Sequence, residues 1–431
     1  MQIDKIILGG YANIEKVELN LASINALVAF NNYGKSNILA GIRFGLSFIR
    51  SGANRKKKQM KFIPAIPIND HIASKPFQFE VVGRVSRAGE ELHVIYGYSF
   101  EWLKNTGEKG ECIREEYLKV KGVGDLKYRT YISREGKDGM YLSAPTGRCD
   151  KPINIDEYTL VVNKISNFDD LFYLDVIQKL NGLKMKYVET LTNPDTFFNM
   201  INPEHSGGEY SLDFPETSDV GFFIYSLKQL DLNRFEQFKD AVQNLLPSIE
   251  DFEPLEIDFK SQVNLSEDSD NVPFRFPEKI YDIRVKERFN NQQTSIGMLS
   301  SGSKKIFFVL AMIIAADLNK IPLIAFEELE NSVHPVLLQN LLLTLDALQG
   351  ETKVLLTSHS PYLIKYLSLE KIKIGIPNKN GLAIFKEIKK GKMSRVQRMA
   401  SEEDASVGDY LFGLLLNALG DENDMLNEIC E

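Results

Sequence analysis

The most constraining feature of this 431-residue sequence is a glycine-containing loop between an apolar run and an amphipathic segment. Ile24–Phe30 is typical of a short buried strand, and apolar residues recur at helical spacing from Lys35 to Phe48. Between them, residues 29–36 read AFNNYGKS, which fits the phosphate-binding loop pattern at every position except Ala29, where the pattern has glycine. The sequence therefore predicts a strand, a phosphate loop and a helix, with an ordinary strand–turn–helix as the alternative.

The loop residues suit a nucleotide. The backbone N–H groups of such a loop surround phosphates, and the helix that follows adds positive potential at its N-terminus. We expect Lys35 to reach the β- and γ-phosphates and Ser36 to ligate Mg²⁺. Because alanine resists a positive φ, Ala29 predicts a distorted or weaker loop. The candidate nucleotide-binding residues here are Asn31, Asn32, Gly34, Lys35, Ser36 and Asn37.

Two further apolar runs end in polar residues. Ile321–Phe326 leads into Glu327 and Glu328, and Val354–Thr357 leads through Ser358 into His359. The segment between these runs has helical periodicity, so the three elements predict a βαβ unit and a parallel sheet. Ligands of open parallel sheets lie at the carboxyl ends of the strands, where these side chains would gather. The alternatives are a strand that ends in exposed acids and a histidine with a structural role.

The rest of the chain predicts a mixed architecture. Two strands are expected to flank a Gly9–Gly10 turn, and residues 77–103 and 114–134 alternate as antiparallel strands do. Residues 165–250 are expected to be helical, and residues 261–275 to form a polar loop. Ile372–Ile376 and Leu382–Ile388 are expected to form a closing hairpin. The fold class predicted is therefore α/β.

Charge and cysteine content narrow the class of protein. The net charge is −8, from 51 basic and 59 acidic residues, which excludes a protein that coats nucleic acid. Three scattered cysteines provide no disulfide framework and fit a reducing cytoplasm. The N-terminus lacks the features of a signal peptide, and no apolar run is long enough to cross a membrane. We therefore expect a cytoplasmic protein.

Two charged segments remain open to more than one interpretation. Residues 50–61 hold six basic and no acidic residues, and are expected to form a loop that either contacts DNA or is simply solvated. Residues 401–431 hold nine acidic residues and no lysine or arginine. The same segment contains an apolar stripe at helical spacing, formed by Tyr410, Leu411, Leu414, Leu415 and Ala418. We expect this stripe to pack on the chain's own core or to mediate assembly.

Taken together, these motifs resemble those of an ABC-class AAA ATPase head of the OLD/RecF/SMC kind. The loop NNYGKSN is followed by GIRFGL, and residues 299–303, LSSGS, resemble the signature motif of that family. Residues 326–335, FEELENSVHP, resemble its Walker B and D-loop segment, and residues 357–361, TSHSP, its switch-histidine segment. The resemblance covers residues 1–50 and 280–375.

The resemblance implies an ABC-type P-loop head with a mixed sheet, an antiparallel β-subdomain and a helical insertion. It implies that ATP is bound between two subunits arranged head to tail. In that arrangement Ser300, Ser301 and Gly302 of one subunit complete the nucleotide site of the other. Glu327 would bind Mg²⁺ with Ser36, and the catalytic residues would be Glu328 as general base and His359 as γ-phosphate sensor. Asn331 would lie where the D-loop crosses the dimer, and His334 is interpreted as local structure or a dimer contact.

The expected segments are 1–160 and 256–395 for the two halves of the head, 161–255 for the helical insertion and 396–431 for the acidic tail. The chain resembles stand-alone ATPases of bacterial anti-phage systems of the PARIS or Septu type. This implies a homodimer or higher homo-oligomer that controls a separate effector nuclease. Two alternatives remain: a RecF/SMC-like DNA-repair ATPase, and a scaffold that binds ATP with little turnover.

Overall fold

The computed structural model of the chain describes residues 1–87, 89–103, 112–189, 196, 198, 210–216, 219–258, 279–331, 333–376, 378–418 and 424–430. The polar loop expected at 261–275 lies outside these residues. The chain divides into two compact units. The first unit comprises Met1–Tyr187, Pro322–Glu327 and Lys353–Glu431, and the second Val188–Ile321 and Glu328–Thr352. This division does not follow the four consecutive segments expected from the sequence, since residues 161–187 belong to the first unit.

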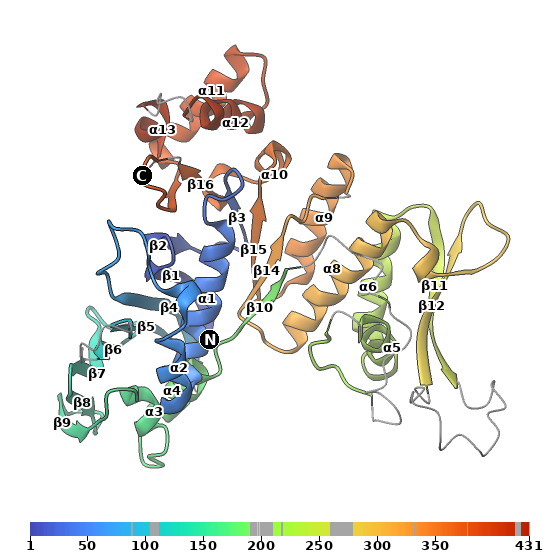
Figure 1. Cartoon of the computed structure of the whole chain (residues 1–431). Helices are drawn as coiled ribbons and strands as arrows, with labels where there is room; N and C mark the ends of the chain where they lie inside the picture. Colours follow the sequence, from blue (N-terminus) through green and yellow to red (C-terminus); the bar gives the residue numbers. More distant parts are fainter. Residues whose placement is uncertain are drawn as a thin grey trace, which may run out of the picture. The chain divides into compact units, whose positions relative to one another are not determined.

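The first unit contains an eight-stranded antiparallel sheet, drawn from blue to green in Figure 1. Its strand order is β2-β1-β4-β5-β6-β7-β8-β9. The strands are β1 (Gln2–Tyr11), β2 (Ile14–Asn20), β4 (Phe77–Arg87), β5 (Glu90–Phe100), β6 (Ile113–Gly122), β7 (Arg129–Glu135), β8 (Asp138–Leu142) and β9 (Cys149–Asn154). In β4, buried and more exposed side chains alternate, as expected for a sheet with one face on the core. The predicted antiparallel strands are confirmed.

The turn predicted at Gly9–Gly10 was wrong. Both glycines lie within β1, and the chain reverses at Ala12, whose φ is 50°, before β2 begins at Ile14. A Cβ atom on Gly10 would lie 1.9 Å from the carbonyl oxygen of Pro76. This glycine therefore permits a close approach between two backbones and does not form the turn.

The second sheet of this unit is mixed and has the order β10-β14-β15-β3-β16-β17. Its strands are β3 (Ile24–Val28), β10 (Met185–Val188), β14 (Leu323–Glu327), β15 (Lys353–Ser358), β16 (Ile372–Ile376) and β17 (Ile384–Glu387). β14, β15, β3 and β16 pair in parallel, and β16 and β17 form the expected antiparallel hairpin. The α/β fold class, with a mixed sheet and an antiparallel subdomain, is confirmed.

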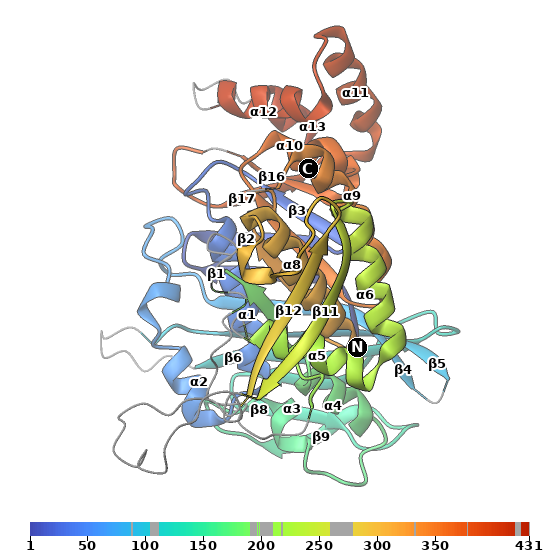
Figure 2. The same ribbon diagram turned by 90° about the vertical axis from the view of Figure 1, so that its right-hand side faces the viewer.

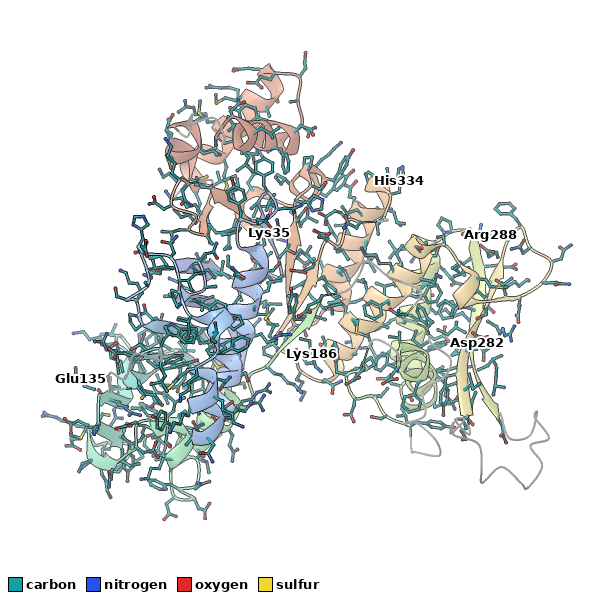
Figure 3. The ribbon with its side chains drawn as sticks, in the orientation of Figure 1. Lys35, Glu135, Lys186, Asp282, Arg288 and His334 are labelled. Atoms are coloured by element: carbon teal, nitrogen blue, oxygen red, sulfur yellow. The ribbon has the colours of Figure 1, made fainter. Side chains whose placement is uncertain are left out.

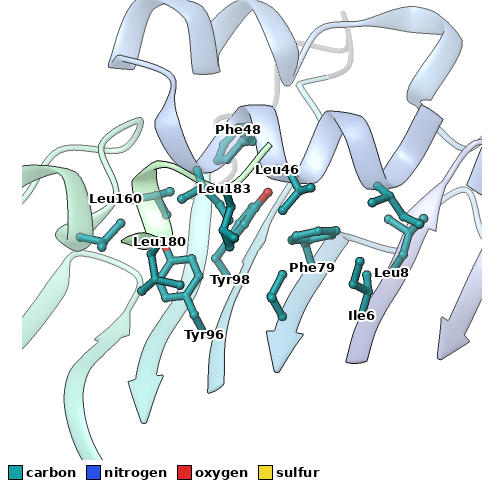
Figure 4. Close-up of a cluster of buried hydrophobic side chains, with 14 of the residues drawn as sticks. Ile6, Leu8, Leu46, Phe48, Phe79, Tyr96, Tyr98, Leu160, Leu180 and Leu183 are labelled. Atoms are coloured by element: carbon teal, nitrogen blue, oxygen red, sulfur yellow. The ribbon is translucent and has the colours of Figure 1, made fainter. Parts of the chain in front are cut away.

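Helix α1 (Lys35–Arg50) packs against the antiparallel sheet. Figure 4 shows side chains of α1 and of the sheet strands pointing toward one another in the shared core. Two glycines allow the close approach: a Cβ atom on Gly41 would lie 2.5 Å from Leu8, and one on Gly45 would lie 2.3 Å from the ring of Phe79. Gly41 and Gly45 therefore determine how closely α1 approaches the antiparallel sheet.

The basic segment 50–61 was expected to be a loop, which was wrong, because residues 53–59 form α2 (Ala53–Gln59). Lys56 is fully buried, and its Nζ donates to Asn163 Oδ1 at 2.7 Å and to the carbonyl oxygen of Ser51. Burial lowers the pKa of Lys56 to about 8, although Glu116 and Asp156 oppose this shift. The other five basic residues of the segment are exposed, namely Arg50, Arg55, Lys57, Lys58 and Lys61.

The remaining helices of the first unit include three at its C-terminus, which Figure 2 shows gathered together. The α-helices are α3 (Val161–Ile165), α4 (Leu174–Asn181), α10 (Pro361–Tyr366), α11 (Met393–Glu402), α12 (Val407–Ala418) and α13 (Asp424–Ile429), and the short 3₁₀ turns are Ile63–Ala65, Leu369–Lys371 and Lys390–Lys392. α12 packs on α10 and α11. Tyr410, Leu411, Leu415 and Ala418 are buried, so the stripe packs on the core of its own unit.

The second unit combines helices with a small antiparallel sheet, β11-β12-β13. Figure 2 faces the long ribbon that β11 and β12 form. The elements are α5 (Val220–Leu230), α6 (Leu232–Leu245), β11 (Ile249–Asp258), β12 (Lys279–Glu287), β13 (Thr294–Ser295), a 3₁₀ turn at Ile296–Met298, α8 (Ser301–Leu318) and α9 (Pro335–Leu348). Every residue of α8 from Lys304 to Ala316 is buried. Among the described residues of the whole chain, no helix is both long and apolar enough to cross a membrane.

Candidate functional site

The predicted phosphate loop connects β3 to α1 and ends at Gly34. Gly34 precedes α1 with φ 87° and ψ 13°, and its carbonyl oxygen accepts the first helical hydrogen bond from Ile38 N at 3.0 Å. A Cβ atom on Gly34 would lie 2.6 Å from Ala383 Cβ and 3.0 Å from Asn13 Oδ1. Both the backbone conformation and the lack of space require glycine here.

Lys35 is buried beneath this loop. Its Nζ donates to the carbonyl oxygens of Ala29 at 2.7 Å and Phe30 at 2.9 Å. Figure 3 shows Lys35 at the start of α1. The ammonium group is therefore tied to the first two residues of the loop, which places a positive charge where the loop would surround an anion.

The distortion expected at Ala29 is absent. Ala29 is not among the described non-glycine residues with positive φ, and its N–H donates to Ser358 O of β15 at 3.2 Å. Its side chain is fully buried and faces Gly375 of β16, where a Cβ atom would lie 2.5 Å from Ala29 Cβ. Alanine fits at this position because the neighbouring strand has a glycine opposite it.

Ser36 and Glu327 meet although 291 positions separate them in the chain. Ser36 Oγ donates to Glu327 Oε1 at 2.6 Å. The sheet explains this contact, because Glu327 pairs with Thr357 of β15, and Thr357 in turn pairs with Leu27 of β3. β14 and β3 therefore end at the same edge of the sheet, with only β15 between them.

The oxygen atoms of Ser36 and Glu327 suit Mg²⁺. This ion takes oxygen ligands at ~2.0–2.1 Å and commonly uses one or two protein ligands together with phosphates and water. Two adjacent ligands of an octahedral ion lie about 2.9 Å apart, so only a small opening of the hydrogen bond is required. Among the described residues, no group of three or more His, Cys, Asp or Glu side chains is arranged so that it could hold a metal ion by itself.

His359 follows β15 at the same edge of the mixed sheet. Ser358 pairs with Val28, the last residue of β3, so His359 leaves the sheet next to the start of the phosphate loop. Ser358 Oγ accepts a hydrogen bond from Ser360 N at 2.9 Å, which fixes the turn around the half-buried histidine. The three strand ends thus bring Lys35, Ser36, Glu327 and His359 to one edge of the sheet.

Three asparagines were expected to bind nucleotide. Asn31 and Asn32 are exposed at the tip of the loop, and Asn32 has φ 66°. Asn37 donates from Nδ2 to Asn13 Oδ1 at 2.8 Å. Asn13 was not predicted, yet its own Nδ2 donates to Gly381 O at 3.2 Å, and it therefore braces the start of α1. A single polar residue in a hairpin turn gives no sequence signal for this role.

An aromatic contact also escaped prediction. The ring of Phe30 meets that of Phe412 edge to face, with 5.3 Å between centroids. Phe412 belongs to α12, so the C-terminal helices touch the phosphate loop directly. Only the apolar periodicity of α12 was visible in the sequence, and periodicity does not identify the partner.

In the second unit, the predicted signature residues begin α8. Ser300 is the N-cap residue, and its Oγ accepts from Ser303 N at 3.2 Å, which gives this hydroxyl a structural role. Ser301 is exposed, and Gly302 is half-buried in the first helical turn. Backbone N–H groups at such a position, together with the helix dipole, favour anions.

Glu328 and Asn331 form a tight turn in the second unit. Glu328 has φ 49°, and Asn331 Nδ2 donates to Glu328 Oε2 at 2.6 Å. Nearby, His334 caps α9 by accepting from Val336 N through Nδ1 at 3.4 Å. This contact gives His334 a local structural role.

Comparison with known sequences gives one family match. Residues 202–365 match a family model described as an AAA domain, putative AbiEii toxin, of a type IV toxin–antitoxin system. The matched range includes the signature, the acidic pair and His359, and it begins after the phosphate loop. No curated protein matches the chain.

Solved structures resemble the chain only distantly. An SmcHead bound to the C-winged helix domain of ScpA is 14% identical to this chain, with a TM-score of 0.47, and the match covers 92% of this chain and 100% of the SmcHead chain. The SMC head domain from Thermotoga maritima is 13% identical, with a TM-score of 0.42 and coverages of 90% and 100%. An Smc head domain with an extended coiled coil, bound to the C-terminal domain of ScpA derived from Pyrococcus furiosus, is 12% identical, with a TM-score of 0.48 and coverages of 93% and 99%. By its sequence, the segment 202–365 of this chain is similar to an AAA domain.

Proposed function

We propose that this chain binds and hydrolyses ATP as an ABC-class ATPase head, with the nucleotide phosphates at the loop between β3 and α1. The observation that supports this best is the 2.6 Å contact of Ser36 Oγ with Glu327 Oε1. An ordinary strand–turn–helix needs no acidic side chain from another strand beside its first-turn serine. A site for Mg²⁺ and phosphate needs that combination.

Each residue has a distinct role in this proposal. Lys35 supplies a fixed positive charge to the terminal phosphates, and Ser36 and Glu327 hold Mg²⁺, which neutralises charge on the phosphates when bound. Glu328 follows Glu327 directly in the chain and accepts a proton from the attacking water. His359 donates a hydrogen bond to the terminal phosphate.

The nucleotide site is completed by a second copy of the chain. The start of α8, with Ser300, Ser301 and Gly302, presents a helix N-terminus and an exposed hydroxyl, which suit a terminal phosphate. In the proposed homodimer each copy supplies these groups to the phosphate loop of the other. Isologous pairing of this kind forms two equivalent sites.

The proposed biological role is that of a sensor or regulatory ATPase in a bacterial anti-phage system that controls a separate effector nuclease. The toxin–antitoxin description of the matched family is compatible with a defence role. The alternative function is a RecF/SMC-like role in DNA repair, in which the exposed basic residues of segment 50–61 would contact DNA. The scaffold with little turnover loses its main argument, because Ala29 fits the loop without a left-handed backbone.

A subunit-mixing experiment tests the proposal. Lys35→Ala removes the charge that holds phosphate, so ATP binding measured by calorimetry should be lost. Gly302→Asp places a negative charge at the start of α8, so turnover should be lost while Lys35 remains intact. A 1:1 mixture of the two variants should recover about a quarter of the wild-type ATPase activity, because half of the dimers retain one intact site.

The control is a chain that carries both substitutions, mixed with the wild-type chain. If sites are shared between subunits, these mixed dimers contain no intact site. Full activity of the wild-type chain in such dimers, or a fully active monomer, would overturn the shared site. Unchanged ATP affinity of Lys35→Ala would overturn the phosphate-loop assignment itself.

A further inference from the structure

The turn that follows β14 has an unfavourable backbone conformation. Glu328 adopts φ 49°, in the left-handed region that non-glycine residues seldom occupy. Asn331 N donates to Glu328 O at 3.1 Å and closes the turn. Such a conformation persists only where neighbouring groups hold it, and it often occurs at functional sites.

A buried lysine holds this turn. Lys305 is fully buried on α8, and its Nζ donates to Glu328 O at 3.0 Å and to Asn331 O at 2.7 Å. One ammonium group therefore binds both ends of the turn. Asn331 Nδ2 also donates to Glu328 Oε2 at 2.6 Å. The backbone and the carboxylate of Glu328 are thus both fixed.

Stability alone does not explain a lysine at this position. From Ile306 to Ala316 the neighbouring residues of α8 are buried and apolar. Burial lowers the pKa of Lys305 to about 8, against the opposing effect of Glu330 and Glu328, so the charged form is held at a cost. Apolar residues often replace buried charges without loss of stability, so a retained buried cation calls for another reason.

The position of Lys305 on its helix supplies that reason. Lys305 lies four residues, about one helical turn, after Ser301. The same helix therefore presents Ser301 and Gly302 at its start and holds the Glu328 turn one turn later.

We propose that Lys305 is a positioning residue that aims the Glu328 carboxylate and couples it to the helix beginning with Ser301 and Gly302. This inference rests on the proposed function of Glu328 as general base. When the start of α8 engages the phosphate of a partner copy, the same helix holds the base of its own copy in place. Hydrolysis would thereby depend on a correctly formed dimer.

The test compares two buried lysines. Lys305→Met keeps the length of the side chain and removes the ammonium group. We expect kcat to fall about 10- to 100-fold with an unchanged Kd for ATP, because small misplacements of a catalytic group have effects of this size. The matched control is Lys56→Met, since Lys56 is also fully buried, also has a pKa of about 8, and also donates to backbone carbonyls. Lys56 contacts the far end of α1, roughly 20 Å along the helix from Lys35. The kcat of Lys56→Met should therefore equal that of the wild type.

A double-mutant cycle separates positioning from a general structural effect. In a Glu328→Gln background, Lys305→Met should cause no further loss of turnover, because the group that it positions is already inactive. Lys305→Arg, which retains the charge and the donors, should recover part of kcat. An equal loss in both backgrounds, or a wild-type kcat for Lys305→Met, would overturn this inference.

A second variant covers the case in which Lys305→Met does not fold. Asn331→Ala removes only the 2.6 Å hydrogen bond to the Glu328 carboxylate. It should lower kcat without changing the Kd for ATP, and a wild-type kcat would again contradict the inference. If the proposed function of Glu328 as general base is itself wrong, the result is different, because Glu328→Gln would then hydrolyse ATP at the wild-type rate.

Discussion

The depth at which α1 lies on the antiparallel sheet can be tested with one methyl group. In Gly45→Ala, the new Cβ atom would lie 2.3, 2.5 and 2.6 Å from three ring atoms of Phe79. The ring is fully buried and cannot turn away freely. Overpacking of this kind costs about 1–3 kcal/mol. Alanine in place of glycine within a helix stabilises by about 1 kcal/mol, which offsets part of this cost.

A second helical glycine provides the matched control. Gly413 lies within α12, and apart from its chain neighbours and the adjacent backbone of the helix itself, no described atom lies within 4 Å of the position that a Cβ atom would take there. Gly413→Ala should therefore stabilise the protein by about 0.4–1 kcal/mol. The two substitutions have the same effect on helix propensity and opposite effects on packing.

The assay is urea unfolding followed by the fluorescence of Trp102, the only tryptophan of the chain. Trp102 belongs to the first unit, where its Nε1 donates to Gly10 O at 2.8 Å. We expect Gly45→Ala to lower the free energy of unfolding by up to about 2 kcal/mol. The double variant Gly45→Ala/Phe79→Leu should recover part of the loss. If Gly45→Ala is as stable as Gly413→Ala, α1 does not lie at this depth.

Two further predictions concern charge. Lys56 has a pKa of about 8 in the folded protein, below its ordinary value of 10.5, so the unfolded chain binds more protons between these pH values and stability rises with pH in this window. Between pH 8 and 10.5, the free energy of unfolding of the wild type should increase by up to about 3 kcal/mol relative to that of Lys56→Met, as measured by Trp102 fluorescence. If the difference in unfolding free energy between the two proteins does not change with pH, Lys56 is not a buried cation. For Ser36→Ala, the Mg²⁺ concentration required for half-maximal ATP turnover should rise about 10-fold, because one oxygen ligand is lost. An unaltered Mg²⁺ titration, with Ser51→Ala as the control, would remove Ser36 from the metal site.

The sequence predicted those parts of the fold that depend on local pattern. Apolar runs and apolar periodicity placed β3, β14 and α1 within a few residues of their observed bounds, because burial imposes such patterns. The loop predicted between β3 and α1 lies at residues 29–34, as the strand–loop–helix expectation required. The proximity of Ser36 and Glu327 was implied by the family resemblance, which assigned both residues to Mg²⁺, and their side chains are in contact.

The errors came from contacts that only the folded chain defines. Gly9 and Gly10 were interpreted as a turn because glycine permits turns, whereas Gly10 is needed where the Pro76 carbonyl approaches. Segment 50–61 was expected to be a loop because it is basic, whereas carbonyl groups at the end of α1 and Asn163 bind Lys56 and stabilise α2. Lys305 went unnoticed because its partners are backbone carbonyls, which no side-chain pattern reveals. Propensity and charge cannot predict such tertiary partners.

The pairing of Ala29 with Gly375 has an evolutionary consequence. The two positions share a volume that accommodates one methyl group, since a Cβ atom on Gly375 would lie 2.5 Å from Ala29 Cβ. A homologue with glycine at position 29, as in the usual loop pattern, could carry alanine at position 375. The ring of Phe385, which lies 3.1 Å from the position of the new Cβ atom, would then have to shift by a few tenths of an ångström. Descendants of a common ancestor should therefore exchange these residues together, and selection should remove chains with alanine at both positions. Covariation between positions 29 and 375 in an alignment of homologues would then indicate which strand lies beside the loop.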